Sequence, residues 1–211
     1  MNNSILIIDI ETDHSDDWEQ FRPEFTAPAN YKDQAKIDAS IQEQSKAWED
    51  KLALSALTGR VLVIGVKSPD NKPTYYEGDE KLMLREFWDS VNSHIHHKYP
   101  VCGWNIIGFD LSFLIRRSWK YKLRIPDLFR GRYYDSNIVD LMQVWQAGNF
   151  KESYVSLDMA AKFFGLPGKS GNGKDFAALY KSDKSAALKY LEQDLTLTEQ
   201  IGNCMGYGRS K

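Results

Sequence analysis

Five residues in three distant segments of this 211-residue chain have side chains suited to metal-assisted chemistry. Asp9 and Glu11 stand two positions apart at the end of a β-branched run, so both would project from one face of a strand. Asp110 lies where a strand-to-loop passage turns into a helix, and Tyr190 and Asp194, four apart, would share one face of a late helix. Each also has an ordinary alternative: a solvated acid at a strand end, a helix N-cap, or a boundary tyrosine beside a surface aspartate.

The order of these residues along the chain is more specific than any one of them. The chain has D-x-E on a first strand, N-x-x-x-F-D before a helix and Y-x-x-x-D on a late helix. In this order it resembles the DEDD superfamily of 3′–5′ exonucleases, which have a ribonuclease-H-like fold. The similarity is greatest to the tyrosine-bearing branch, which includes the proofreading exonuclease domain of family B DNA polymerases. The histidine branch requires a histidine five residues before the last aspartate, where this chain has Lys189.

The resemblance implies a role for each residue of the pattern. Tyr190 would orient or activate the attacking water, and four carboxylates would bind metal, namely Asp9, Glu11, Asp110 and Asp194. Two divalent ions about 3.5–4 Å apart stabilise both the attacking and the leaving oxygen in phosphodiester hydrolysis. Mg²⁺ prefers such hard oxygen ligands, and Mn²⁺ shares the preference. Because a phenol with its usual pKa of about 10 is a poor base at pH 7, we expect Tyr190 to position a metal-bound water.

Candidate substrate contacts surround the second motif and follow the first. By the same resemblance, Asn105 would hydrogen-bond the 3′-terminal nucleotide, and Thr12 would approach the terminal sugar. Trp104 and Phe109 are candidates for stacking on a base. An aromatic residue in an apolar strand or loop is, however, more often part of the core.

The charge of the chain is unevenly distributed, although its net value is only −2. Residues 1–50 hold 12 acidic and 4 basic side chains, whereas residues 51–211 hold 17 and 23. Residues 116–132 carry seven basic groups and one acid. We expect Arg116 and Arg117 in this cluster to contact the nucleic-acid backbone, since phosphate neutralisation supplies most sequence-independent affinity. The alternative is a solvated helix face.

Hydrophobic periodicity predicts the elements that must position these residues. We predict strands over about 5–10, 60–66, 74–76 and 101–105, and helices over about 79–95, 110–121, 156–164 and 184–202. Strands that alternate with helices predict an α/β fold, and the resemblance implies a ribonuclease-H-like mixed β-sheet flanked by α-helices. We expect residues 1–211 to form one such domain. Residues 13–58 are too long for an ordinary connection and predict a mostly helical or irregular insertion after the first strand.

Composition places the chain among globular proteins. A hydrophobic fraction of 42% is enough for a core and excludes collagen-like, disulfide-dense and wholly disordered chains. Two cysteines suit a reducing compartment. The first residues lack the pattern of a signal peptide, and no run of about 18 apolar residues occurs, so we expect a cytoplasmic protein without a membrane span.

The resemblance, with which these features agree, implies a metal-dependent 3′–5′ exonuclease that releases nucleoside 5′-monophosphates from single-stranded ends. The expected cofactors are two Mg²⁺ or Mn²⁺ ions. DNA is the favoured substrate over RNA, and replication or repair proteins are the candidate partners. Two alternatives stay open: an exoribonuclease that acts on short RNA, and a catalytically idle nucleic-acid-binding module on the same fold.

Overall fold

The computed structural model describes residues 5–69, 71–130, 133–149, 151, 154–169, 171 and 173–207. The chain divides into two compact units: a body made of residues 1–11 and 61–211, and an insertion made of Thr12–Arg60. Strand β1 (Leu6–His14) ends in the insertion, and strand β2 (Gly59–Lys67) begins in it. The insertion therefore leaves the body from the end of one strand and returns at the start of the next.

The body is built on a mixed five-stranded sheet with the strand order β3-β2-β1-β4-β7. β1 pairs in parallel with β4 (Val101–Gly103), and β4 pairs in parallel with β7 (Ile138–Asp140). β2 pairs antiparallel with β3 (Thr74–Glu77). A separate antiparallel hairpin joins β5 (Phe129–Arg130) and β6 (Tyr133–Tyr134). The mixed sheet and its helices confirm the predicted α/β class.

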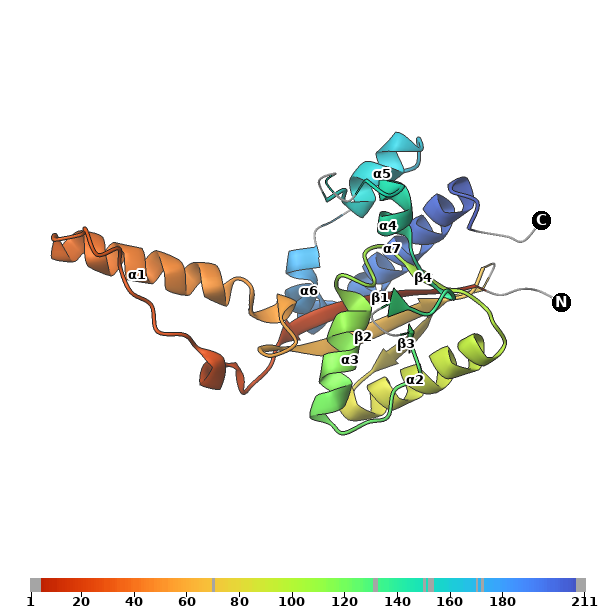
Figure 1. Ribbon diagram of the computed structural model, residues 1–211, viewed down its shortest axis with the longest axis horizontal. Coiled ribbons are helices and arrows are strands. Elements are labelled where there is room, and N and C mark those ends of the chain that lie inside the picture. Colours follow the sequence, from red (N-terminus) through yellow and green to blue (C-terminus); the bar gives the residue numbers. More distant parts are fainter. Residues whose placement is uncertain are drawn as a thin grey trace. The chain divides into compact units, whose positions relative to one another are not determined.

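Helices cover both faces of this sheet (Figure 1). On one face α2 (Glu80–His96) packs against α3 (Asp110–Lys120). On the other lies α7 (Lys184–Cys204), which contacts α5 (Leu157–Phe163) and α6 (Phe176–Ser182), and the short α4 (Leu141–Gln146) follows β7 directly. In the described part of the chain, no helix is both long and apolar enough to span a membrane.

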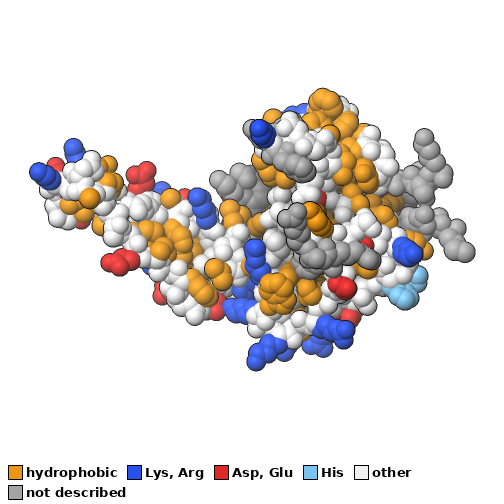
Figure 2. Space-filling model, in the orientation of Figure 1, with side chains coloured by type: hydrophobic (Ala, Val, Ile, Leu, Met, Phe, Trp, Pro, Cys, Tyr) orange, Lys and Arg blue, Asp and Glu red, His pale blue; other side chains and the backbone are white. Residues whose placement is uncertain are grey.

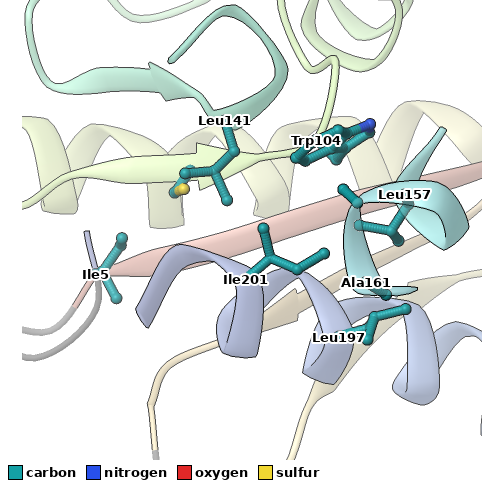
Figure 3. Close-up of a cluster of buried hydrophobic side chains, with 9 residues drawn as sticks. Ile5, Trp104, Leu141, Leu157, Ala161, Leu197 and Ile201 are labelled. Carbon is teal, nitrogen blue, oxygen red and sulfur yellow. The ribbon is translucent and has the colours of Figure 1, made fainter. Parts of the chain in front are cut away.

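The core of the body lies between the sheet and α7. Leu191 and Leu195 of α7 share a buried cluster with Ile7 and Val63. A Cβ added at Gly65 would lie 2.9 Å from Leu195 Cδ1, so the glycine lets the helix approach the strand closely. Figure 3 shows a second buried cluster that joins α7 and α5 to the parallel strands, with Ile5, Trp104, Leu141, Leu157, Ala161, Leu197 and Ile201.

The predicted strands and helices of the body are present, with shifts of a few residues at their ends. Ser156 caps α5, since its hydroxyl accepts a hydrogen bond from the Met159 amide at 3.3 Å. Gly165, with φ +70°, follows the end of this helix. The sequence pattern did not predict β5, β6, β7, α4 or α6. Each spans only two to seven residues, which is too short for a periodic pattern.

The insertion contains one long helix, α1 (Gln34–Glu49), and two short 3₁₀ helices, Trp18–Phe21 and Leu52–Leu54. The Asp33 carboxylate caps α1 by accepting from the Ala35 amide at 2.9 Å. Trp48 contacts Trp18 and Phe25, with ring centroids 5.6 and 6.2 Å apart. No residue of α1 is fully buried, so this small aromatic cluster supplies much of the helix's apolar contact.

Candidate active site

The register of β1 turns two acids toward α7. Ile5 and Ile7 pack on α7 side chains, and strand side chains alternate, so Asp9 and Glu11 continue along the same face. One carboxylate oxygen each from Asp9, Glu11 and Asp194 can lie within 4.8 Å of one another. The body therefore brings together two of the three predicted motifs at this point.

The packing of α7 on the sheet also orients its two predicted site residues, Tyr190 and Asp194. Leu191 and Leu195 pack on the sheet, and Tyr190 and Asp194 immediately precede each of them in the sequence. Asp194 is only 3% exposed, and Tyr190 is 9% exposed. The packing of the leucines thus fixes the rotation of α7 that points the tyrosine and the aspartate at β1.

Asp110 joins the site from α3. It is the first residue of that helix, and its carboxylate accepts a hydrogen bond from the Ile10 amide of β1 at 3.0 Å. The alternative that Asp110 is an N-cap is excluded, because Phe109 occupies the cap position. Asp110 is 3% exposed, and it lies close enough to Asp9 for their charges to repel. The predicted acids thus come from three elements that are far apart in sequence.

Burial and mutual repulsion make these acids hard to ionise in the absence of a cation. Burial, together with the charge of Asp194, raises the pKa of Asp9 from 3.8 to about 7. Burial and the neighbouring carboxylates raise the pKa values of Glu11 and Asp110 well above their ordinary range. A divalent cation would reverse this penalty, because it stabilises the charged form of each carboxylate that it contacts.

Lys169 is the one cation that the structure places against these acids within the described residues. Its Nζ lies 2.5 Å from Asp194 Oδ2 and 5.2 Å from the centre of the Tyr190 ring. Burial by itself would lower the pKa of Lys169, but Asp194 and Tyr190 together outweigh burial and raise it. The Lys169 amide donates to the Asp158 carboxylate at 2.9 Å, which fastens the loop to α5. The sequence marks Lys169 only by its place in a Gly- and Lys-rich loop, as a weaker candidate for contacting the nucleic-acid backbone.

The buried Tyr190 hydroxyl makes no hydrogen bond of good geometry in the part of the chain that the structure describes, although Lys169 and Asp194 lie close enough to interact with it. Burial raises the pKa of this phenol to about 12. The loop after Lys169 covers the ring closely, since a Cβ added at Gly171 would lie 3.2 Å from Tyr190 Cε2. A polar atom buried without a partner is costly, and a metal-bound water would satisfy it. The donor set of hard oxygens and this unsatisfied hydroxyl therefore fit a divalent metal centre.

Asp140 organises the turn that leads into α3, and the sequence analysis missed it. Its carboxylate accepts from the Asn105 amide at 3.1 Å, from the Ile107 amide at 2.9 Å and from the Met142 amide at 3.0 Å. Asn105 adopts φ +61°, which asparagine tolerates better than most residues. The only signal in the sequence was an aspartate after a short apolar run, because the helix that it caps, α4, is too short to be predicted.

The structure gives two predicted substrate contacts a different role. Arg117 is 2% exposed, and its guanidinium donates to both carboxylate oxygens of Glu80 on α2, so it is a buried structural ion pair. Trp104 is 8% exposed, and its indole N–H donates to the Val155 carbonyl at 3.0 Å (Figure 3 shows its ring in the core cluster). Both side chains are occupied inside the body and are not available to a strand of nucleic acid.

The other predicted contacts remain accessible or partly accessible. Arg116 is exposed, and Phe109 is half-buried beside Phe113, with ring centroids 5.6 Å apart. Asn105 is half-buried, and its side-chain oxygen would lie 2.3 Å from a Cβ added at Gly108. Thr12 belongs to the insertion, where its hydroxyl donates to the Ala53 carbonyl at 2.7 Å.

Comparisons with known proteins agree with this geometry. A family described as a predicted 3′–5′ exonuclease related to the exonuclease domain of PolB matches residues 60–198. An uncharacterized protein of Methanocaldococcus jannaschii is 28% identical over 162 residues, which cover 70% of this chain and 86% of that protein. The structure of the family B DNA polymerase from the hyperthermophilic archaeon Pyrobaculum calidifontis matches 96% of this chain with a TM-score of 0.61 and 18% identity.

Both the structural match and the family match are partial. This chain spans 24% of the length of the Pyrobaculum polymerase. The family match includes Asp110, Tyr190 and Asp194 but begins after the first motif, so Asp9 and Glu11 are assigned by the geometry of β1. With more than half of its length matched, the chain belongs to the family of 3′–5′ exonucleases related to the exonuclease domain of PolB.

Proposed function

We propose that this 3′–5′ exonuclease hydrolyses the 3′-terminal phosphodiester bonds of single-stranded DNA and releases nucleoside 5′-monophosphates with the aid of two divalent ions. One observation carries the proposal. Buried acids from β1, α3 and α7 meet beside a tyrosine whose buried hydroxyl makes no hydrogen bond of good geometry among the described residues. A structural role for so many close carboxylates is hard to justify, because they raise one another's pKa values and destabilise the metal-free fold.

Asp9, Glu11 and Asp194 would hold the metal ions, with Asp110 contributing from the start of α3. Bound divalent cations lower the pKa of water and stabilise the departing sugar oxygen. Tyr190 remains protonated at neutral pH, since its pKa is about 12, and it therefore acts as a hydrogen-bond donor. We assign it to orienting the attacking water.

Lys169 complements the negative charge of the substrate. Its ammonium group contacts Asp194 and lies over the Tyr190 ring, so a scissile phosphate bound beside these residues would come within its reach. The phosphoryl group gains charge-stabilising contacts from this ammonium group without any movement of the backbone. Asn105, at the turn that leads into Asp110, is our candidate for contacting the 3′-terminal nucleotide.

End-labelled oligonucleotides test this function directly. We expect stepwise shortening from the 3′ end with Mg²⁺ or Mn²⁺ and none with EDTA. Asp9→Ala and Asp194→Ala should each lower the rate by at least about 10³-fold, in keeping with loss of metal-ion catalysis. The matched control is Asp183→Ala, which removes the exposed N-cap of α7 and should retain most of the activity.

The same assay decides the substrate. Faster shortening of DNA than of RNA of the same sequence supports the proposal, and the reverse preference would identify an exoribonuclease. Absence of metal-dependent shortening of either nucleic acid, with oligonucleotide binding retained, would show that the chain is an idle binding module. Replication or repair proteins are the partners we propose for a nuclease of this kind, and their effect on the rate can be measured by adding them to the assay.

A further inference from the structure

One face of α3 stays exposed after the body has packed. The helix buries Leu111, Leu114 and Ser118. The residues on its other side recur at intervals of three or four and are exposed or partly exposed, and we call them the α3 track: Phe109, Ser112, Arg116, Trp119 and Lys120. This spacing places them on one side of a helix, in a line that starts next to Asp110.

The α3 track ends near Trp119, whose aromatic ring is mostly exposed. Trp119 is 60% exposed, whereas Trp88 of α2 is buried, and its indole N–H donates to the Ser118 hydroxyl at 2.7 Å. Phe109 lies at the opposite end and is partly covered by Phe113. An exposed aromatic ring offers a face on which any unpaired base can stack.

Basic side chains accompany this aromatic surface. Arg116 and Lys120 are exposed on the track itself, and Lys122 and Arg124 are exposed in the segment that follows α3. Asp127 is the only acid in residues 116–132. Figure 2 shows Lys and Arg side chains gathered along α3 and around its lower end in that view. Arg117 adds nothing to this surface, because Glu80 neutralises it in the interior.

The length of the track sets how much of a strand it can accommodate. Trp119 is nine residues after Asp110, and a helix rises about 1.5 Å per residue, so the two are about 14 Å apart along the axis. Stacked nucleotides advance about 3.4 Å each along one strand, which corresponds to about four nucleotides. A strand whose 3′ end lies at the acids would thus reach Trp119 with about its fourth or fifth base.

We propose that the α3 track is a binding subsite for single-stranded nucleic acid, in which Arg116 and Lys120 contact phosphates and Trp119 stacks on a base about four nucleotides from the 3′ end. The inference rests on the proposed function for the direction of the strand. A base must be unpaired to offer its face to Trp119, so the subsite selects single strands over duplexes. It also makes substrate length a determinant of affinity.

Oligonucleotide binding to the full chain in EDTA tests the subsite without hydrolysis. With 5′-fluorescein-labelled strands of 3 and 10 nucleotides and anisotropy as the readout, Trp119→Ala should weaken binding of the 10-mer about tenfold. It should leave binding of the 3-mer unchanged. Trp119→Phe should stay within about twofold of the wild type for both lengths, because it keeps an aromatic face. Leu82→Ala is the matched control, since Leu82 is 50% exposed on α2 and should affect neither length.

The charge contribution is measured from the salt dependence of the same binding. Loss of two phosphate contacts in an Arg116→Ala, Lys120→Ala double variant should reduce the slope of log K against log salt by about 1.4 for a single strand. Lys181→Ala on α6 removes a basic residue elsewhere on the body and should leave the slope unchanged.

Equal affinity of wild type and Trp119→Ala for the 10-mer, or an equal loss for the 3-mer, would overturn the subsite. So would tighter binding of a 10-base-pair duplex than of the 10-mer. Failure of the proposed function gives a different result, namely no shortening with Mg²⁺ while the Trp119-dependent binding of the 10-mer persists. Circular dichroism of Trp119→Ala and the behaviour of Trp119→Phe separate loss of stacking from loss of the fold.

Discussion

At the scale of single residues, the metal-free site already contains one positive charge. Lys169 contacts Asp194, which is among the acids that can hold metal. The ammonium group offsets part of the repulsion among the carboxylates, and it also repels any cation that approaches them. Lys169 should therefore increase the rate of turnover and decrease the affinity of the site for metal.

Lys169→Met is expected to tighten Mn²⁺ binding by at least about fivefold and to lower kcat by about tenfold. The variant removes the competing charge but also the group that we assign to the phosphate. Isothermal titration calorimetry and the shortening assay measure the two effects. Lys162→Met, which removes an exposed lysine paired with Asp158, should change neither. Weaker Mn²⁺ binding in Lys169→Met would contradict this assignment.

Tyr190→Phe separates catalysis from packing. The buried hydroxyl makes no hydrogen bond of good geometry among the described residues, so its removal should leave the melting temperature of the metal-free chain unchanged or slightly higher. The rate should fall by about tenfold but not vanish, because the metal ligands remain. A wild-type rate in this variant would remove the hydroxyl from the mechanism.

The acids also predict how stability depends on pH. The pKa of Asp9 rises from 3.8 to about 7 on folding without metal, so its contribution to stability is fully present below about pH 4 and lost as the pH rises toward 7. In EDTA, the melting temperature of the wild type should therefore fall between pH 5 and pH 8 relative to that of Asp9→Asn. Saturating Mg²⁺ at pH 8 should restore it. Parallel pH profiles of the two proteins in EDTA would show that Asp9 does not titrate in this range.

At the scale of elements, the turn from β4 to α3 decides how the second motif is presented. The Asp140 carboxylate holds the turn by accepting from the Asn105 and Ile107 amides within it and from the Met142 amide of α4. This network positions Asn105. Two glycines, one at the end of β4 and one in the turn, are crowded for different reasons. A Cβ at Gly103 would meet Ile106 Cγ2 at 2.2 Å and the Ile8 backbone carbonyl at 2.8 Å, whereas a Cβ at Gly108 would meet only the end of the Asn105 side chain at 2.3 Å.

The two glycine variants should therefore behave differently. Gly108→Ala should displace the side-chain carboxamide of Asn105 and raise KM about five- to tenfold, with little change in the free energy of unfolding. Gly103→Ala should push β4 away from β1 and lower the free energy of unfolding by about 1–3 kcal/mol. Urea denaturation and initial rates on a labelled oligonucleotide measure both. An unchanged KM in Gly108→Ala would argue against a substrate contact by Asn105.

The sequence predicted the helices and strands that are long enough to show a periodic pattern. It also predicted the site residues whose order along the chain is specific. The alternation of β1 and the four-residue spacing on α7 predicted that Asp9 and Glu11 share one face, as do Tyr190 and Asp194. That the two pairs form one site was implied by the resemblance and depends on the packing of α7 on β1. Arg117 could not be assigned in this way, since its partner Glu80 is 37 residues away and becomes a neighbour only when α2 packs on α3. For the same reason Asp140 was missed and Lys169 was only a weaker candidate: tertiary contacts define their roles.

At the scale of the whole molecule, the acidic insertion and the basic body account for the small net charge. Residues 1–50 carry most of the excess acid, whereas the surface around α3 is basic. Two bound divalent ions would add four positive charges and offset the four site acids. A net charge of −2 is therefore compatible with a nucleic-acid substrate.

The insertion can be tested by deletion, because its two chain ends are adjacent. The Ser15 amide donates to the Thr58 carbonyl at 2.8 Å, so a short glycine linker can replace residues 16–57. We expect the shortened chain to fold and to shorten single strands at close to the wild-type rate. If the insertion limits access to single strands, the variant should also degrade blunt duplex ends at least about tenfold faster than the wild type. An unchanged duplex rate in a folded variant would reject that role.

The position of Asp194 in α7 has a consequence for folding during synthesis of the protein. Asp194 is synthesised 185 residues after Asp9, on the helix whose leucines complete the core beside β1. Because chains fold from the N-terminus as they are synthesised, a nascent or prematurely terminated chain lacks both the last ligand and the helix that buries it. The metal site therefore cannot form until α7 has been synthesised and has packed beside β1.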